Sequence, residues 1–181
     1  LNTLTLKKEI SSIDGMNEEE VYNLIKKYLK ENPIEGILSE DERKDFMNTI
    51  HEVINKKTLC LIPSFSFSRS QTLMCMLYEE FKDIEDLHCQ FIIDSRLTCE
   101  INSAYREILK GEEREYFNKV MAWDRFKFIS NYKDTINLAT KNDGIPKIII
   151  SSSGFMEAGH VREWAKQILG NKNAYICFVG Y

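Results

Sequence analysis

The sequence predicts an α/β fold, with a doubly wound, mostly parallel sheet and helices on both faces. From residue 58 onward, short apolar runs alternate with segments of helical periodicity. The run Ile148–Ile150 is β-branched throughout, which is typical of a strand buried on both faces of a parallel sheet. Residues 151–154 end this strand, and apolar residues at helical spacing over 161–169 precede another strand. These observations predict a β-loop-α-β unit.

We expect residues 1–181 to form a single domain, of which residues 1–57 are a helical N-terminal part. Asn17 can cap a first helix, which Pro33 ends. Ser39 and Glu42 form a capping-box pattern at the start of a second helix. Each helix carries a single apolar face, so both are expected to cover another part of the molecule.

The rest of the chain divides into short strands and longer helices in alternation. Pro63, Ser130 and Gly170 are among the residues that mark where elements end. The predicted strands are 58–62, 90–93, 126–129, 148–150 and 174–179, and the predicted helices are 70–81, 98–110, 112–123, 132–141 and 161–169.

Composition narrows the class of protein. With 181 residues, 43% hydrophobic and 29% charged, the chain can bury a core. Its net charge is −4, so any nucleic-acid contact must be a local patch. Five cysteines without a C-x-x-C pair are typical of reduced thiols in an intracellular protein, and we expect a cytoplasmic location. Because no apolar stretch approaches the roughly 20 residues that span a bilayer, no membrane contact is expected.

Polar residues follow the predicted strands, at the edge where ligands bind in such folds. Ser152, Ser153 and Gly154 follow one strand, and could seat a phosphate or cap the next helix through their hydroxyls. His160 stands at the start of that helix, where an imidazole can donate to a phosphate. Asp94 ends the strand at 90–93, and could bind a ligand or hold a neighbouring loop.

Arg69 and Gln71 lie in or beside the first turn of the helix predicted at 70–81. A cation is unfavourable at a helix N-terminus, so Arg69 requires an acidic partner or a bound phosphate. Asp94 is one possible partner, and direct substrate contact is the alternative. Arg96 could likewise contact a phosphate or pair with Asp94.

Three segments of the chain carry a resemblance to a known family. Residues 61–71 read LIPSFSFSRSQ, residues 91–98 read FIIDSRLT, and residues 147–181 open KIIISSSGFM and end in GY. In the same order, they resemble the IPAFAxGRxQE loop, the DSPLA segment, and the ASSGM loop with a later GY of the β-CASP region in metallo-β-lactamase-fold nucleases. The match covers residues 58–181, and Ser68 stands where the family pattern has Gly.

The resemblance implies a domain that forms one wall of a substrate cleft and grips a nucleic-acid backbone. RNA is the expected substrate, as in RNase J-type exonucleases and the endonuclease of pre-mRNA 3′-end cleavage, with DNA as the alternative. The expected substrate-binding residues are Arg69, Gln71, Asp94, Ser152, Ser153, Gly154 and His160. The family motifs do not include His160, which is added because of its position in the sequence.

The family chemistry is phosphodiester hydrolysis by two metal ions, expected to be zinc, in a metallo-β-lactamase domain of the same parent chain. The H-x-H-x-D-H ligand motif of that domain does not occur in this sequence. We therefore expect no catalytic or metal-binding residue in this sequence. We expect the chain to be an excised piece of a larger protein and to be inactive alone. The parent protein can be a homo-oligomer.

Two other functions are open from the sequence. One is a non-catalytic nucleic-acid-binding or scaffolding subunit of an RNA-processing complex, whose partner domain has lost its metal ligands. The other is an unrelated α/β nucleotide-binding domain, although neither G-x-G-x-x-G nor G-x-x-x-x-G-K-[ST] follows any predicted strand.

Overall fold

The computed structural model describes residues 4–5, 20 and 40–179. Apart from Glu20, the first predicted helix, after Asn17, lies outside these residues, as do the terminal Gly180 and Tyr181. The described strands form one sheet in the order β1-β6-β2-β5-β3-β4. Strand β1 pairs antiparallel with β6, and the remaining pairs are parallel. The strands are β1 Leu4–Thr5, β2 Leu59–Pro63, β3 Gln90–Asp94, β4 Phe126–Ile129, β5 Lys147–Ser151 and β6 Tyr175–Phe178.

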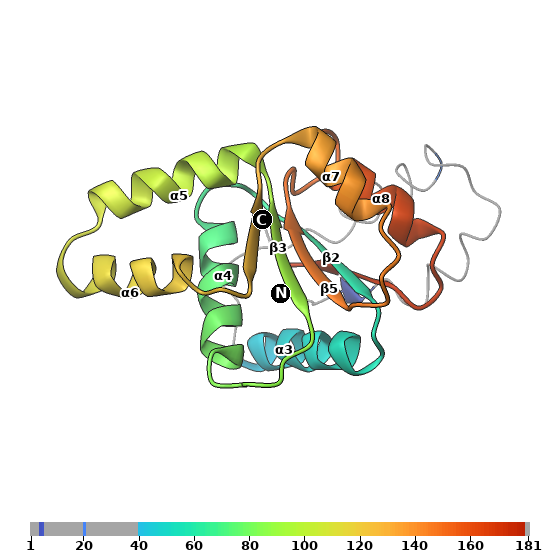
Figure 1. Cartoon of the computed structure of the whole chain (residues 1–181), viewed down its shortest axis with the longest axis horizontal. Helices are drawn as coiled ribbons and strands as arrows, with labels where there is room; N and C mark the ends of the chain where they lie inside the picture. The colour runs from blue at the N-terminus through green and yellow to red at the C-terminus, as the bar shows by residue number, and fades with distance from the viewer. Residues whose placement is uncertain (1–3, 6–19, 21–39, 180–181) are drawn as a thin grey trace.

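Helices cover both faces of the sheet, as the sequence predicts (Figure 1). Helices α3, α4 and α6 contribute to the core on one face, while α7 and α8 pack on the other. Right-handed connections between parallel strands account for this division, because the chain moves across the sheet in one direction from β2 to β4 and returns through β5 to β6. The helices are α3 Glu40–Asn55, α4 Arg69–Phe81, α5 Arg96–Ile108, α6 Gly111–Met121, α7 Tyr132–Ala139 and α8 Val161–Leu169.

The central strand β5 is buried along its whole length, which confirms the prediction from its β-branched run. Ile149 belongs to the core beneath α7 and α8, whereas Ile148 and Ile150 belong to the core beneath α3 and α4. Successive side chains of a strand point to opposite faces, so three adjacent isoleucines supply both layers. Helix α3, predicted only to cover something, adds Phe46 and Ile50 to the second of these cores.

Helix α5 begins two residues earlier than its apolar pattern indicates. Ser95 is its N-cap, and its hydroxyl accepts a hydrogen bond from the backbone N–H of Thr98. The sequence pattern places the helix start at Thr98 because Arg96 and Leu97 are exposed and carry no periodic signal. Together, α5 and α6 extend away from the sheet at the left of Figure 1. None of the described helices is long and apolar enough to cross a membrane.

A buried ion pair closes the opposite end of the sheet, at the start of β5. Lys147 is 3% exposed, and its Nζ lies 2.5 Å from Asp143 Oδ1 and 3.3 Å from the Ile145 carbonyl oxygen. Burial alone would raise the pKa of Asp143, but the hydrogen bonds from Lys147 and the Ile145 N–H, with the nearby Lys141, lower it overall. Asp143 therefore stabilises the fold as a carboxylate.

Candidate functional site

The carboxyl ends of four parallel strands stop at the same level. Pro63 of β2 and Asp94 of β3 both pair with Ser151, the last residue of β5, and Asp94 also pairs with Ile129, the last residue of β4. This edge is at the top of Figure 1. Because the strands end in register, the loops that follow them emerge side by side. Ligands bind at this edge in open α/β sheets.

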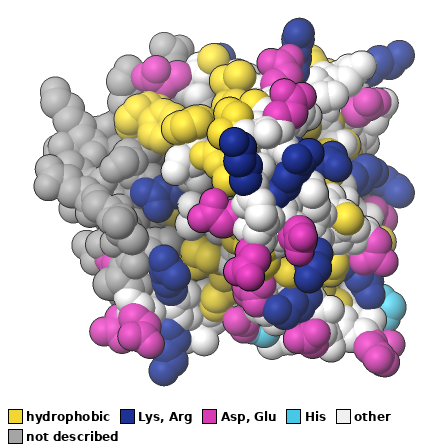
Figure 2. Space-filling view, turned by 90° about the vertical axis from the view of Figure 1, so that its left-hand side faces the viewer, with side chains coloured by type: hydrophobic (Ala, Val, Ile, Leu, Met, Phe, Trp, Pro, Cys, Tyr) yellow, Lys and Arg dark blue, Asp and Glu magenta, His cyan; other side chains and the backbone are white. Residues whose placement is uncertain are grey.

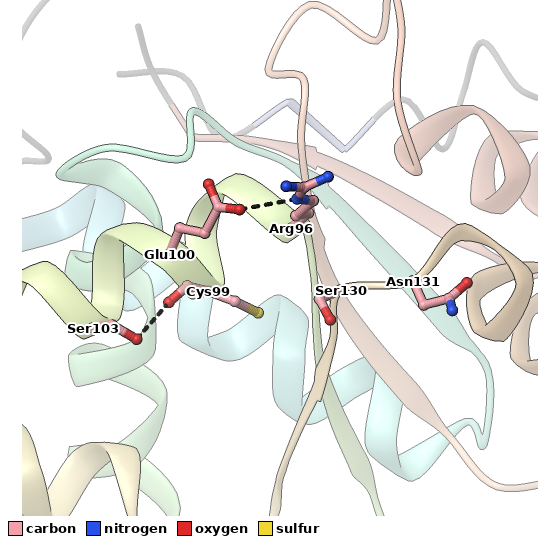
Figure 3. Close-up of a pocket in the computed structure, with 6 residues that line it drawn as sticks. All are labelled: Arg96, Cys99, Glu100, Ser103, Ser130 and Asn131. Carbon is pink, nitrogen blue, oxygen red and sulfur yellow. Dashed lines mark hydrogen bonds and ion pairs between the residues drawn. The ribbon is translucent and has the colours of Figure 1, made fainter.

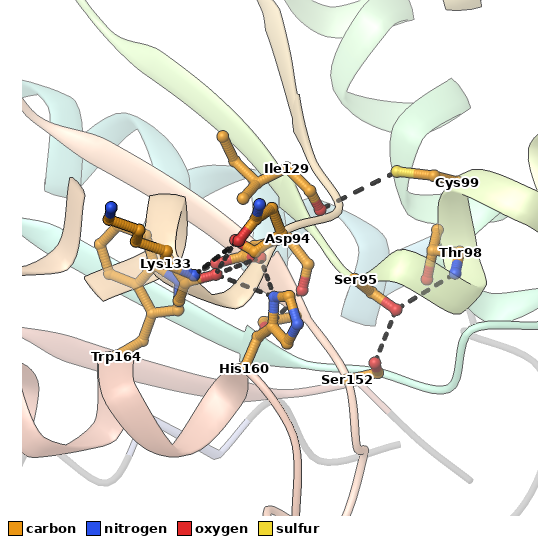
Figure 4. A network of polar contacts seen from close by, with 12 residues as sticks. Asp94, Ser95, Thr98, Cys99, Ile129, Lys133, Ser152, His160 and Trp164 are labelled. Atoms are coloured by element: carbon orange, nitrogen blue, oxygen red, sulfur yellow. Dashed lines mark hydrogen bonds and ion pairs between the residues drawn. The ribbon is translucent and has the colours of Figure 1, made fainter. Parts of the chain in front are cut away.

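Asp94 is the buried centre of this edge. Its side chain is 0% exposed, and it joins three elements to β3 (Figure 4). Trp164 Nε1 of α8 donates to Oδ2 at 2.6 Å, and Thr135 Oγ1 of α7 donates to Oδ1 at 2.9 Å. His160 Nδ1, in the residue before α8, lies 2.6 Å from the same Oδ1. These donors satisfy a carboxylate that would otherwise be costly to bury.

A pair with Asp94 is one of two sequence alternatives for Arg69 and for Arg96, and neither pair is formed. Arg96 pairs with Glu100 on the exposed face of α5, with 2.9 Å between Nε and Oε1, so the possible Arg96–Asp94 pair is not formed. Among the described residues, the ion pairs of Asp94 include His160 but not Arg69. Both oxygens of Asp94 are instead taken by donors from α7 and α8.

Three hydroxyls tie the loops of this edge together. Ser152 Oγ, after β5, donates to Ser95 Oγ, after β3, at 2.7 Å. Ser66 Oγ, after β2, lies 3.2 Å from the same Ser95 oxygen. Ser95 and Ser66 are absent from the residues predicted for the site. Ser95 could have been found from its N-cap position, three residues before Thr98.

The loop at 152–160 is held by its own residues. Ser153 Oγ accepts a hydrogen bond from the Glu157 N–H at 3.2 Å, and Gly154 is buried. Gly159 has a φ of +88°, and a Cβ there would lie 2.9 Å from the Ser152 carbonyl oxygen. Helix α8 starts only at Val161, so these serines do not sit at its first turn. The structure therefore shows no hydroxyl cap on α8, one of the two sequence alternatives, and the phosphate seat stays a prediction.

The loop before α4 contains a tight γ-turn. Ser68 has φ 64° and ψ −56°, and the Arg69 N–H donates to the Phe67 carbonyl oxygen at 2.7 Å. This γ-turn with positive φ is rare and strained for a residue that has a Cβ. Serine thus adopts positive φ where the family pattern has glycine, and the turn places Arg69 at the first position of α4.

Gln71 lies inside the molecule rather than at its surface. It is 4% exposed, and its Nε2 donates to the Ser66 carbonyl oxygen at 3.0 Å and to Asn102 Oδ1 at 2.7 Å. A side chain in this position cannot reach a substrate on the exposed edge. Gln71 instead holds the loop after β2 against α5, so the expected substrate contact is replaced by a supporting role.

Exposed aromatic side chains stand on the same edge. Phe67 is 66% exposed and its ring lies 6.0 Å from that of Tyr105. Phe65 and Phe155, from the loops after β2 and β5, meet edge to face at 5.4 Å. Figure 2 shows hydrophobic side chains gathered near the upper end of the molecule, above a region where acidic and basic side chains are interspersed. Rings exposed in this way can stack on unpaired bases.

A groove of about 580 Å³ lies beside the edge, between α5 and the segment from β4 to α7 (Figure 3). Its cysteine, Cys99, is a poor candidate nucleophile, because burial and the negative charges of Asp94 and Glu100 raise the pKa of the thiol. The groove is lined by Arg96, Cys99, Glu100, Ser103, Ser130 and Asn131.

The described part of the chain holds no group of three or more His, Cys, Asp or Glu side chains that could bind a metal ion. Asp94 and His160 are adjacent, but Thr135 and Trp164 complete their surroundings with a hydroxyl and an indole N–H. An indole N–H can only donate, so it cannot serve as a metal ligand. The residues present here do not fit a zinc site.

Comparisons with known proteins agree on one family. A sequence model of the Beta-Casp domain matches residues 70–181. Transcription termination factor FttA of Methanococcus maripaludis is 28% identical over 149 residues, which cover 78% of this chain and 23% of that protein. The same factor from Pyrococcus horikoshii is 28% identical over 149 residues, covering 78% and 22%. Integrator complex subunit 11 of Danio rerio is 25% identical over 138 residues, covering 76% and 23%. The chain thus spans under a quarter of each of these relatives.

Proposed function

The chain belongs to the β-CASP domain family, and from this premise we propose that it is the substrate-clamping domain of a zinc-dependent, metallo-β-lactamase-fold nuclease that hydrolyses RNA. The observation that carries the proposal is the level edge of the sheet, where in-register strand ends bring several loops together. Hydroxyls, an imidazole and exposed rings on one edge suit a nucleic-acid backbone and its bases.

RNA is the proposed substrate, with DNA as the alternative. In support, two relatives are named as transcription termination factors and a third as a subunit of the Integrator complex. The net charge of −4 requires that the contact be local, which the hydroxyl and aromatic groups of the edge provide.

The zinc and the hydrolytic step belong to the proposed parent protein rather than to these residues. On the strength of family membership, we assign the two zinc ions to a metallo-β-lactamase domain of the same parent chain, and we expect this chain to be inactive alone. That domain and RNA are the proposed partners, and the parent can form a homo-oligomer. A cytoplasmic location is proposed on the basis of the five free cysteines.

The test is cleavage by the full-length parent protein. A labelled single-stranded RNA and the DNA of the same sequence are incubated with the zinc-loaded protein, and then again after chelation and after zinc is restored. We expect RNA to be cut only while zinc is present. Zinc-loaded protein that binds RNA without cutting it would instead establish the scaffolding alternative. Saturable binding of a mononucleotide in place of RNA would reject both.

A further inference from the structure

His160 has one nitrogen committed to the interior. Its Nδ1 lies 2.6 Å from Asp94 Oδ1 and 2.8 Å from Thr135 Oγ1. Trp164 Nε1 can only donate, so Oδ2 of the Asp94 carboxylate accepts from it, and Oδ1 can accept from His160 Nδ1. The imidazole is therefore oriented with Nδ1–H inward.

The second nitrogen of His160 faces the edge. The side chain is 15% exposed, and in Figure 4 its free nitrogen points to the side on which Ser95 and Ser152 lie. The Tyr132 ring packs edge to face against the imidazole, with centroids 5.5 Å apart. Among the described residues, Nε2 has no hydrogen-bond partner. Position and tautomer are both fixed, and a polar atom is presented at the surface.

A purely structural role accounts poorly for Asp94. Joining α7 and α8 to the sheet requires only apolar contact, which their core already supplies. A buried carboxylate adds a desolvation cost, and replacement of such groups by apolar residues is often neutral or stabilising. A carboxylate beneath a histidine does what no apolar residue can do, because it sets which imidazole nitrogen carries the inward hydrogen.

We propose that His160 Nε2 hydrogen-bonds the RNA backbone, and that Asp94 and Trp164 position it. In the neutral ring Nε2 accepts from a ribose 2′-hydroxyl, and in the ring protonated on both nitrogens it donates to a phosphate oxygen. The inference rests on the proposed function and names one contact within it. Phosphate oxygens and 2′-hydroxyls are the groups that an RNA backbone offers to a side chain of this size. The hydroxyl cluster of Ser66, Ser95 and Ser152 lies on the same side and fixes the loops around the contact.

Two substitutions distinguish the roles of the two ring nitrogens of His160. In His160→Asn the amide nitrogen takes the place of Nδ1 and retains the bond to Asp94, but nothing reaches the position of Nε2. In His160→Gln the side-chain amide takes the place of Nε2, where its oxygen can accept and its nitrogen can donate. The matched control is His51→Asn, because His51 also pairs with a carboxylate, Glu80 at 2.6 Å, but on α3 and in an exposed position.

The measurement is the dissociation constant of the full-length parent protein for a short single-stranded RNA. We expect His160→Asn to weaken binding about ten-fold, which is the loss of one hydrogen bond to a charged or polar backbone group. The dissociation constant of His160→Gln should stay within about three-fold of the wild-type value, and that of His51→Asn should equal the wild-type value. Trp164→Phe should weaken binding through a misplaced imidazole.

Backbone substitutions in the RNA identify the atom contacted. Methylphosphonate and 2′-deoxy groups are introduced one position at a time. The substitution that removes the partner of His160 weakens binding to the wild type and has no further effect in His160→Asn. A methylphosphonate result assigns a phosphate oxygen, and a 2′-deoxy result assigns a ribose hydroxyl.

The inference is overturned if His160→Asn binds RNA as tightly as the wild type, or if every backbone substitution adds its full effect in that variant. A wild-type protein that cleaves RNA while His160→Asn also binds normally would remove this contact and leave the proposed function intact. A wild-type protein that neither binds nor cleaves RNA would remove both.

Discussion

Replacement of Trp164 by Phe tests the hydrogen bond that anchors α8 to Asp94. Trp164 is completely buried, and its Nε1 donates to Oδ2 of a carboxylate that is itself 0% exposed. Phenylalanine keeps an aromatic ring in the core but carries no donor. The substitution therefore leaves one carboxylate oxygen in the interior without the partner that it has in the folded protein.

Two contributions set the size of the effect. A hydrogen bond to a charged group contributes about 1.5–3 kcal/mol, and leaving such an acceptor buried and unpaired incurs a loss of this order. Phenylalanine is smaller than tryptophan, so the substitution also leaves a cavity in a fully packed site. Trp→Ala costs about 3–5 kcal/mol of stability, and we assign about 1–2 kcal/mol to this smaller cavity. We expect the free energy of unfolding to fall by about 3–4 kcal/mol.

Urea unfolding followed by circular dichroism measures this loss, and Trp123→Phe provides the comparison. Trp123 packs among Phe91, Phe126 and Tyr78, so the same change there removes ring contacts but no bond to a carboxylate. We expect it to cost about 1 kcal/mol. Equal losses in the two variants would mean that the indole N–H contributes nothing, and the account of Asp94 as an anchor would be wrong.

Three further predictions follow from local geometry. Ser68→Gly should raise the free energy of unfolding by about 1 kcal/mol, because glycine adopts positive φ without strain, and Ser68→Ala should not; equal midpoints in urea would contradict this. Asp143→Asn should destabilise by about 2–4 kcal/mol at neutral pH, since it leaves the buried Lys147 without its carboxylate. The folded pKa of Asp143 is lowered, so its stabilisation is present above its unfolded value near 3.9 and is lost as the pH falls through the folded value; the two proteins should converge in acid, and a constant gap would refute this. Cys99 should react with iodoacetamide at pH 8 more slowly than cysteine in a peptide, because its pKa is raised; peptide mass spectrometry would show an equal rate if burial does not protect it.

The elements of the fold follow closely from the sequence because their signals are local. The isoleucines of β5 predict a strand buried on both faces, and helical spacing predicts α8, including buried Trp164. Asp94 does end β3, as predicted, at the edge that we propose as the functional one. Its partners could not be predicted, because Thr135 and His160 are 41 and 66 residues away in the chain. Only tertiary packing brings them together.

Whether a given side chain of the candidate site is exposed was the hardest feature to predict. A polar residue within a family motif gives no sign of whether its side chain points out or in. Gln71 turns inward to Ser66 and Asn102. Phe67, in the same loop as Ser66, is by contrast 66% exposed, although its side chain is apolar. Side-chain direction in loops depends on backbone angles that composition does not reveal.

The single carboxylate at Asp94 has a consequence for how the molecule opens. Helix α7, helix α8 and the loop that carries His160 each bond to the side chain of Asp94. If one of them separates from β3, the carboxylate that holds the other two loses a partner. Their amides should therefore exchange with solvent deuterium as one cooperative unit, at a common rate. A ligand that engages His160 would slow exchange throughout that unit, including amides that it never touches.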